Sequence, residues 1–477
     1  MQRWHLTAGL AGLAVVGALL APRLTGRIAP QPPDPPPAEP QVVPPVAVVA
    51  IPTEAEGHLI VQARLDRNAV LRGQPQERFL AITISAPDDI GEHFRRPVDI
   101  GVVMDASGSM AARGKIDYAK SAAKLLATSM ETRDVYSLVT FSDDATVIVP
   151  ATAVSDAYPI HHAVDGIREG GGTNLYAGLD KGAGEVRRSL DDQSVGRIVL
   201  LSDGNANVGV TDPSALGRYV SSLASQGVTV STVGLGLDYN EDLLARLADL
   251  GGGTYDFVDD PRELTAVFSD ELERSASVVA RGTRVTIDLP EGVRGMEVIG
   301  WDATPTETGW TVWMGDVYAG DARKIIARVQ VTGTQQDLMP VASISARYND
   351  IVDGRAAASS TTATATTTTE VARVEASLDK KTAVEAVRAW GNEFLVQSTR
   401  AYTDGDVEEA KKLAGQSRDI LDEAATEFDN DTLRGDAANT RQQIGVYGSY
   451  APASAEGRRA VKATKEFYNE QSREIIE

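Results

Sequence analysis

The chain has 477 residues, no cysteine, five histidines and a formal net charge of −21. The absence of cysteine excludes disulfides, thiolate zinc sites and cysteine nucleophiles. The negative charge disfavours nucleic acids and anionic membrane surfaces as partners. A chain of this length is expected to divide into about two to four domains.

The first part of the chain predicts an export segment followed by a spacer. Residues 6–21 form an apolar stretch behind Arg3, which suits the core of a signal peptide and is short for a spanning helix of roughly 20 residues. No clean cleavage site follows, so an uncleaved anchor stays open. Residues 30–45 contain nine prolines and predict an extended spacer. We assign residues 1–22 to the signal peptide or membrane anchor and residues 23–57 to a Pro-rich linker.

Two segments alternate apolar and polar residues with a period of two, which is typical of half-buried strands. One lies within residues 58–97, and the other lies within residues 279–372. We expect both to belong to one β-sandwich. The Thr-rich run at residues 359–369 fits either a linker or a final strand, and the strand propensity of threonine favours the strand.

The central segment, residues 98–278, alternates strand and helix patterns and predicts a doubly wound, mostly parallel, Rossmann-like α/β sheet inserted in or flanked by the β-sandwich. The expected strands are 98–105, 135–141, 146–149, 197–202, 228–235 and 254–258. The expected helices begin at residue 115 and span 159–167, 175–188, 213–226, 241–250 and 261–276.

The last segment, residues 373–477, is expected to be an α-helical region. Val384, Val387, Trp390 and Phe394 recur at helical spacing. The turn at residues 404–406 separates this helix from a second one that reaches Phe428, which fits an antiparallel pair. A charged terminal helix is expected over residues 462–476.

One predicted strand end carries a set of oxygen ligands. The apolar run 100–104 ends at Asp105, and Ser107 and Ser109 follow with Gly108 between them. Ligands of open α/β sheets bind beyond the carboxyl ends of the strands. Three hard oxygen donors on one tight loop suit Mg²⁺. Mn²⁺ would bind the same oxygens, and Ca²⁺ is a further alternative.

The pattern Asp105-x-Ser107-x-Ser109 resembles the metal-ion-dependent adhesion site (MIDAS) of von Willebrand factor A (VWA) domains. The resemblance implies that Thr173, in a loop before a later helix, and Asp203, at the end of the next central strand, complete the metal ligands. It also implies that the aspartates often act through water and that a partner carboxylate completes the shell. The flanking segments resemble bacterial exported VWA proteins of the chloride-channel-like or inter-alpha-trypsin inhibitor heavy chain-like type.

These features predict a metal-dependent protein-binding or adhesion module of the bacterial cell envelope, in the periplasm or at the cell surface. Its expected partner is a protein that supplies an Asp or Glu carboxylate. The sequence has neither a phosphate-binding loop nor a nucleophile elbow, so we do not expect an enzyme. Two alternatives stay open: an assembly factor that binds through the helical tail, and a metal-dependent hydrolase. For the hydrolase, Asp143, Asp144 and Asp238 are on loops that could approach the same face, but nothing pairs them with a nucleophile.

Overall fold

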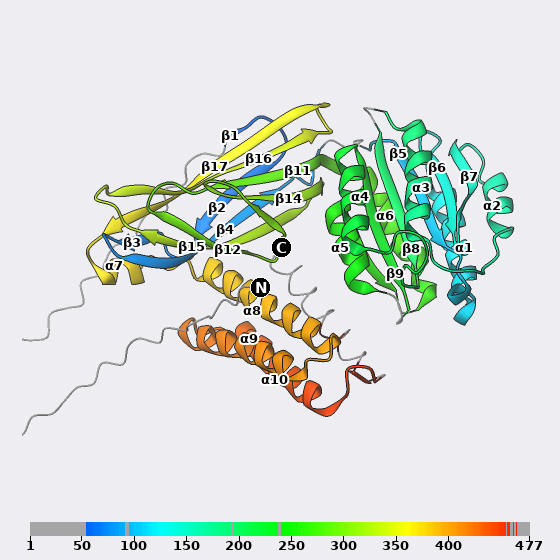
Figure 1. Cartoon of the computed structure of the whole chain (residues 1–477). Helices are drawn as coiled ribbons and strands as arrows, with labels where there is room; N and C mark the ends of the chain where they lie inside the picture. Colours follow the sequence, from blue (N-terminus) through cyan, green and yellow to red (C-terminus); the bar gives the residue numbers. More distant parts are fainter. Residues whose placement is uncertain are drawn as a thin grey trace, which may run out of the picture. The chain divides into compact units, whose positions relative to one another are not determined.

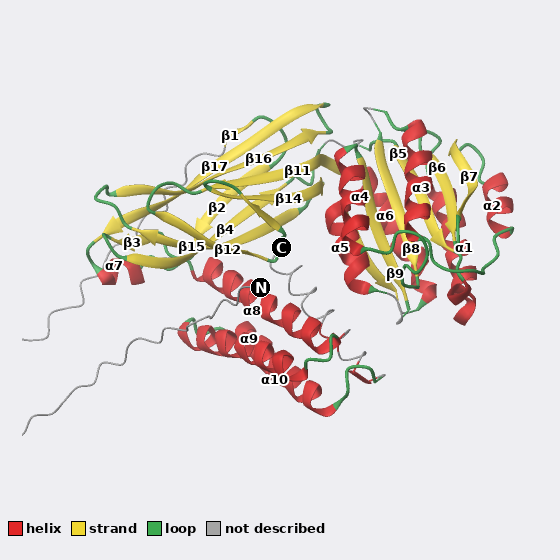
Figure 2. Cartoon of the chain, viewed as in Figure 1, coloured by secondary structure: helices red, strands yellow, loops and turns green. Residues whose placement is uncertain are grey.

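The computed structural model describes residues 54–454 apart from residues 91–94, 192–193, 237–239 and 259, together with residues 456, 457, 461 and 464. The predicted export segment, most of the Pro-rich linker and most of the predicted terminal helix lie outside the described residues. The described elements form an α/β sheet, two antiparallel sheets and a set of C-terminal helices (Figures 1 and 2). The predicted fold class is therefore confirmed. No helix in the described part of the chain has both the length and the apolar character that crossing a membrane requires.

The α/β sheet has six strands in the order β10-β9-β8-β5-β6-β7. Only β7 is antiparallel to its neighbour. The strands are β5 (Val98–Asp105), β6 (Val135–Phe141), β7 (Ala145–Ala153), β8 (Val195–Ser202), β9 (Val228–Leu235) and β10 (Gly252–Val258). Every residue of β5, β8 and β9 is buried, which explains why apolar residues predominate in these strands. The short strand expected at 146–149 is longer because β7 pairs with the whole of β6.

Helices cover both faces of this sheet (Figure 2). One face packs against α1 (Lys115–Ser129), α2 (Tyr158–Asp165) and α6 (Leu264–Ala276). The other face packs against α3 (Leu175–Ser189), α4 (Pro213–Ser225) and α5 (Glu241–Gly251). The last predicted helix starts later than expected, because Pro261–Glu263 forms a separate 3-10 turn.

The β-sandwich contains a seven-stranded sheet and a four-stranded sheet around one apolar core. The larger sheet contains β1 (Glu54–Ala55), β3 (Ala69–Leu71), β11 (Val278–Asp288), β13 (Ala303–Pro305), β14 (Gly309–Tyr318), β16 (Leu338–Asp350) and β17 (Arg355–Thr368). The smaller sheet contains β2 (Ile60–Leu65), β4 (Pro75–Ser85), β12 (Val293–Ile299) and β15 (Ala322–Thr332). Strand β4 pairs with β15 along its whole length, so strands from both sides of the α/β unit share one sheet, as predicted. The Thr-rich run forms most of β17, which confirms the strand.

The C-terminal helices are α7 (Val371–Glu375), α8 (Lys380–Thr403), α9 (Val407–Glu427) and α10 (Asp431–Ser449). Helix α9 packs against both α8 and α10. The side chains of Asp379, Asp406 and Asn430 cap the three long helices by accepting a backbone N–H bond, which satisfies a donor that the first helical turn leaves open. The sequence pattern predicted α8 and α9, and it predicted no individual helix over the residues of α10.

Candidate metal centre

Asp105 is the last residue of β5, and two hydrogen bonds fix its carboxylate. The backbone N–H of Ser107 donates to Oδ1 at 2.8 Å, and the Ser202 hydroxyl donates to Oδ2 at 2.6 Å. Ser202 ends β8, which pairs in parallel with β5 so that Met104 lies opposite Leu201. The ends of these central strands therefore meet at the carboxyl edge of the sheet, where ligands bind in open α/β folds.

The two predicted serines connect this loop to Asp203. The hydroxyl oxygens of Ser107 and Ser109 lie 2.9 Å apart, and the Ser109 hydroxyl donates to Asp203 Oδ1 at 2.7 Å. Asp203, which follows β8, is only 1 % exposed. Four of the predicted ligands therefore form one connected cluster.

Thr173 joins the cluster from a glycine-rich loop before α3. Two backbone bonds dock this loop on the Asp105 loop, from Gly108 N–H to the Gly171 carbonyl at 3.1 Å and from Gly170 N–H to the Ala106 carbonyl at 2.8 Å. Gly171 has φ +81°, and a Cβ there would lie 2.6 Å from an Asp143 oxygen, so a larger residue does not fit.

The hydroxyl of Thr173 faces the same space as the other predicted ligands. A Cβ placed on Gly204 would lie 3.4 Å from Thr173 Oγ1, 3.7 Å from Ser109 Oγ and 4.0 Å from Asp105 Oδ2. Oxygens from two separate loops therefore lie around one point beside Gly204, which directly follows Asp203. The structure brings together all five residues that the sequence singled out.

The carboxylates considered for hydrolysis have other contacts. Asp143 Oδ1 accepts the backbone N–H of Gly172 at 2.8 Å, and Asp144 Oδ1 accepts that of Ala145 at 2.8 Å. These bonds hold the glycine-rich loop and the start of β7. Asp238 lies outside the described residues.

Lys115 also belongs to the cluster, although it is not one of the five predicted ligands. It is the first residue of α1, and its Nζ lies 2.6 Å from Asp203 Oδ2. Both side chains are nearly inaccessible, with 10 % and 0 % exposure. No local sequence pattern marks this contact, because Asp203 lies 88 residues further along the chain.

Burial dominates the electrostatics of the site. Burial raises the pKa of Asp105, hydrogen bonds from Ser202 and Ser107 oppose that rise, and the neighbouring Asp203 charge adds to it. Two carboxylates and one ammonium sum to one negative charge, surrounded by three hydroxyl groups. An all-oxygen donor set of this kind fits a hard divalent cation.

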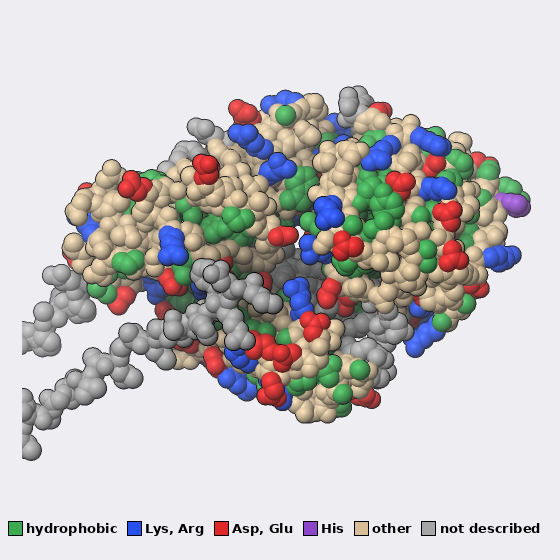
Figure 3. Space-filling view, in the orientation of Figure 1, with side chains coloured by type: hydrophobic (Ala, Val, Ile, Leu, Met, Phe, Trp, Pro, Cys, Tyr) green, Lys and Arg blue, Asp and Glu red, His purple; other side chains and the backbone are tan. Residues whose placement is uncertain are grey.

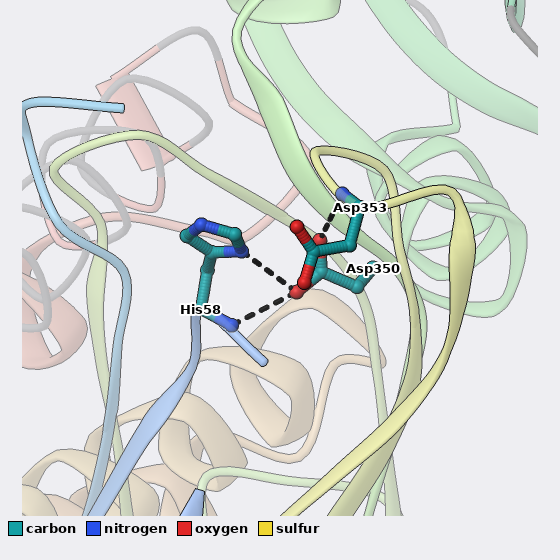
Figure 4. A group of neighbouring side chains, drawn as sticks. All are labelled: His58, Asp350 and Asp353. Carbon is teal, nitrogen blue, oxygen red and sulfur yellow. Dashed lines mark hydrogen bonds and ion pairs between the residues drawn. The ribbon is translucent and has the colours of Figure 1, made fainter. Parts of the chain in front are cut away.

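A second group of potential ligands lies in the β-sandwich (Figure 4). His58 donates its backbone N–H to Asp350 Oδ2 at 2.8 Å, and its Nδ1 lies 2.9 Å from the same oxygen. Asp353 N–H donates to Asp350 Oδ1 at 2.9 Å. These bonds hold the pKa of Asp350 below its usual value although burial works in the opposite direction. These bonds give the group a structural role, because they connect the segment before β2 to the β16–β17 hairpin. The spacing of the three residues in the sequence gave no signal for the group.

The comparisons with known proteins agree with this architecture. The family model of the von Willebrand factor type A domain matches residues 99–270. YfbK of Escherichia coli, an uncharacterized protein, is 28 % identical over 269 residues, which are 55 % of this chain and 47 % of YfbK. Inter-alpha-trypsin inhibitor heavy chain H4 of Homo sapiens is 28 % identical over 249 residues, 50 % of this chain and 26 % of H4. The match thus spans less than half of YfbK and about a quarter of H4.

Solved structures share the fold. A von Willebrand factor type A protein from Catenulispora acidiphila has a TM-score of 0.61 at 17 % identity, covering 79 % of this chain and 89 % of that one. The ArnB paralog VWA2 from Sulfolobus acidocaldarius has a TM-score of 0.58 at 20 % identity, covering 86 % and 98 %. Residues 99–270 therefore match the von Willebrand factor type A domain, and the two solved structures share the fold of most of the chain.

Proposed function

We propose that this protein is a metal-dependent protein-binding module. In this proposal Asp105, Ser107, Ser109, Thr173 and Asp203 hold Mg²⁺, and an Asp or Glu carboxylate of a partner protein completes its coordination. The convergence of their oxygens at the carboxyl edge of the α/β sheet carries the proposal. Mn²⁺ or Ca²⁺ would meet the same donors.

The charge balance of the cluster supports a partner carboxylate. Asp105, Asp203 and Lys115 together carry one negative charge. A divalent cation would reverse the sign and leave one positive charge in a largely buried site. Such a charge attracts an anion strongly because little water screens it.

The contacts of the serines favour binding over catalysis. The Ser107 hydroxyl contacts the Ser109 hydroxyl, and the Ser109 hydroxyl donates to the Asp203 carboxylate. Nucleophilic catalysis needs a base that takes the hydroxyl proton, whereas in this proposal the same bonds would hold the serine oxygens in place for a cation. A bound Mg²⁺ would supply Lewis-acid attraction for an anionic oxygen.

The proposed location is the cell envelope. The apolar stretch at residues 6–21 and the prolines of residues 30–45 support export and a spacer in front of the folded part. In this arrangement the metal centre would meet partners in the periplasm or at the cell surface.

The test compares Asp105→Ala with Asp270→Ala, which removes an exposed carboxylate from α6. Isothermal titration should show Mg²⁺ or Mn²⁺ binding to the wild type and to Asp270→Ala, and loss of binding in Asp105→Ala with an unchanged circular dichroism spectrum. The wild type and Asp270→Ala should also capture a partner from an envelope extract, whereas Asp105→Ala should not. EDTA should abolish this capture. Capture that persists unchanged in EDTA would contradict the proposal, as would metal binding by Asp105→Ala.

A further inference from the structure

Two arginines face each other across neighbouring strands of the seven-stranded sheet. The antiparallel pairing of β11 with β16 places Arg284 directly opposite Arg347. The pairing of β11 with β14 places Trp313 on the other side of Arg284. The neighbouring strands β14, β11 and β16 therefore place Trp313, Arg284 and Arg347 in one row across the sheet.

This arrangement is unfavourable unless an anion compensates it. Like charges directly opposite each other in an antiparallel pair destabilise the sheet. Within residues 54–454, apart from the gaps given above, neither Arg284 nor Arg347 has an acidic partner, although the chain as a whole is strongly acidic. Arg284 lies over the Trp313 ring, with its guanidinium carbon 5.6 Å from the ring centre. Both arginines are exposed.

The row borders a groove. The groove has a volume of about 790 Å³ and is also lined by Arg281, by residues 224–227 at the end of α4, and by Ala356–Ala358 of β17. Arg281 is fixed by donating to the Ser194 carbonyl at 2.7 Å. Among the described residues that line the groove, Glu56 is the one acidic residue. Figure 3 shows basic side chains gathered over β16 and β17.

The groove is separate from the metal centre. Gly227, which lines it, directly precedes β9, so this part of the groove lies at the amino edge of the α/β sheet. Asp105 and Asp203 lie at the carboxyl edge. A ligand of the groove would therefore bind independently of the cation.

We propose that this groove binds an acidic peptide segment of a partner protein, with two carboxylates on Arg284 and Arg347. Guanidinium groups bind carboxylates through two parallel hydrogen bonds. Acidic residues at positions i and i+2 of an extended peptide project to one side about 7 Å apart, which suits neighbouring arginines on paired strands. Trp313 and Ala356–Ala358 provide apolar surface for the intervening residues. The volume lies in the range of about 300–1,000 Å³ typical of ligand sites and exceeds the needs of a single inorganic anion.

The test uses a fluorescein-labelled peptide with Glu at three alternate positions and a matched peptide with Gln at the same positions. Anisotropy is measured on the full chain in EDTA, so that the metal centre does not contribute. The wild type should bind the Glu peptide at least tenfold more tightly than the Gln peptide, and the affinity should fall with added salt. Equal binding of both peptides would overturn the proposal.

Arg347→Glu provides the decisive variant. It should weaken the binding of the Glu peptide at least tenfold. The midpoint of thermal unfolding should stay constant or rise, because Arg284 then faces a carboxylate. Arg294→Glu makes the same charge change at an exposed site on β12 and should bind like the wild type. Equal affinities of the two variants would overturn the proposal, and so would tighter binding of a single-stranded oligonucleotide than of the peptide. Because EDTA is present throughout, neither result bears on the proposed metal centre.

Discussion

Lys115 places a fixed positive charge beside the proposed cation. Its ammonium bonds to the Asp203 oxygen that Ser109 leaves free. The lysine thus lowers the net negative charge of the pocket and repels a metal ion, while it holds Asp203 in position. We therefore expect the site to bind a metal ion more weakly, and an anionic partner more strongly, than it would without the lysine.

We expect Lys115→Met to bind Mn²⁺ or Mg²⁺ more tightly, on the order of tenfold, because an ammonium close to the cation disappears. Isothermal titration checks the result. Lys120→Met is the control, since the Lys120 ammonium donates to the Ile167 carbonyl and pairs with no carboxylate of the site. Equal or weaker metal affinity of Lys115→Met would show that the lysine is needed to position Asp203.

Asp99 makes the stability of the α/β unit depend on pH. Burial on β5, together with the charges of Asp191 and Asp134, raises its pKa to about 6 against an opposing hydrogen bond from Ser189. The folded state therefore binds this proton more tightly than the unfolded state. The stabilisation from protonation is complete below about pH 4 and is lost as the pH rises through about 6.

From this shift we expect the unfolding free energy of the wild type to rise by about 1 kcal/mol, relative to that of Asp99→Asn, when the pH falls from 8 to 5. Urea unfolding of both proteins at the two pH values measures the difference. Identical pH slopes would mean that Asp99 does not titrate in this range.

Among the elements, α3 shows how a helix approaches a sheet through glycine. A Cβ at Gly182 would lie 2.3 Å from Val103 Cγ2 on β5, whereas nothing lies within 4 Å of a Cβ at Gly184, two residues further along the same helix. The small residue at position 182 therefore sets the distance between α3 and the central strand.

The two glycines give a matched pair of substitutions. Gly182→Ala should destabilise the protein by about 1–3 kcal/mol through overpacking. Gly184→Ala should stabilise it by roughly 0.5–1 kcal/mol, because alanine is the better helix former. Chemical unfolding of the two variants should give shifts of opposite sign, and a stabilising Gly182→Ala would contradict the packing argument.

Most elements could be predicted because local pattern determines them. Strand β5 and helix α1 follow from an apolar run and from helical spacing, and their starts match the prediction. Asp105, Ser107 and Ser109 could be named because their loop follows a recognisable strand end, and the resemblance to the MIDAS pattern then pointed to Thr173 and Asp203. Three features could not be predicted from the sequence: the strand order of the sandwich, the Lys115 contact and the Arg284–Arg347 pair. Each depends on which distant segments of the chain become neighbours.

At the scale of the whole molecule, a buried arginine ties the α/β sheet to the β-sandwich. Arg197 of β8 is fully buried, and its Nε lies 3.1 Å from Glu271 Oε1 of α6. Its Nη2 donates to the Tyr318 hydroxyl at 2.8 Å and lies 3.7 Å from Asp316 Oδ2, both on β14. The guanidinium thus neutralises carboxylates from both parts of the fold.

Arg197→Met should cost about 3–5 kcal/mol of unfolding free energy, because it leaves two buried carboxylates without their cation. Replacing Glu271 and Asp316 by their amides in the same protein should recover part of this loss. Arg188→Met removes a 68 % exposed arginine that pairs with Glu185, and it should cost no more than about 1 kcal/mol. Denaturant titration compares the three proteins, and equal costs for both arginine variants would contradict the proposed role of the junction.

The shared sheet of β4 and β15 also sets the order in which the newly synthesised chain can fold. Strand β4 ends at Ser85, and its partner β15 begins only at Ala322, after the whole α/β unit. The α/β unit can complete its parallel sheet from a continuous segment, whereas β4 must wait for its partner to be translated. During synthesis the edge of β4 that later pairs with β15 therefore stays unpaired until the central domain has been made.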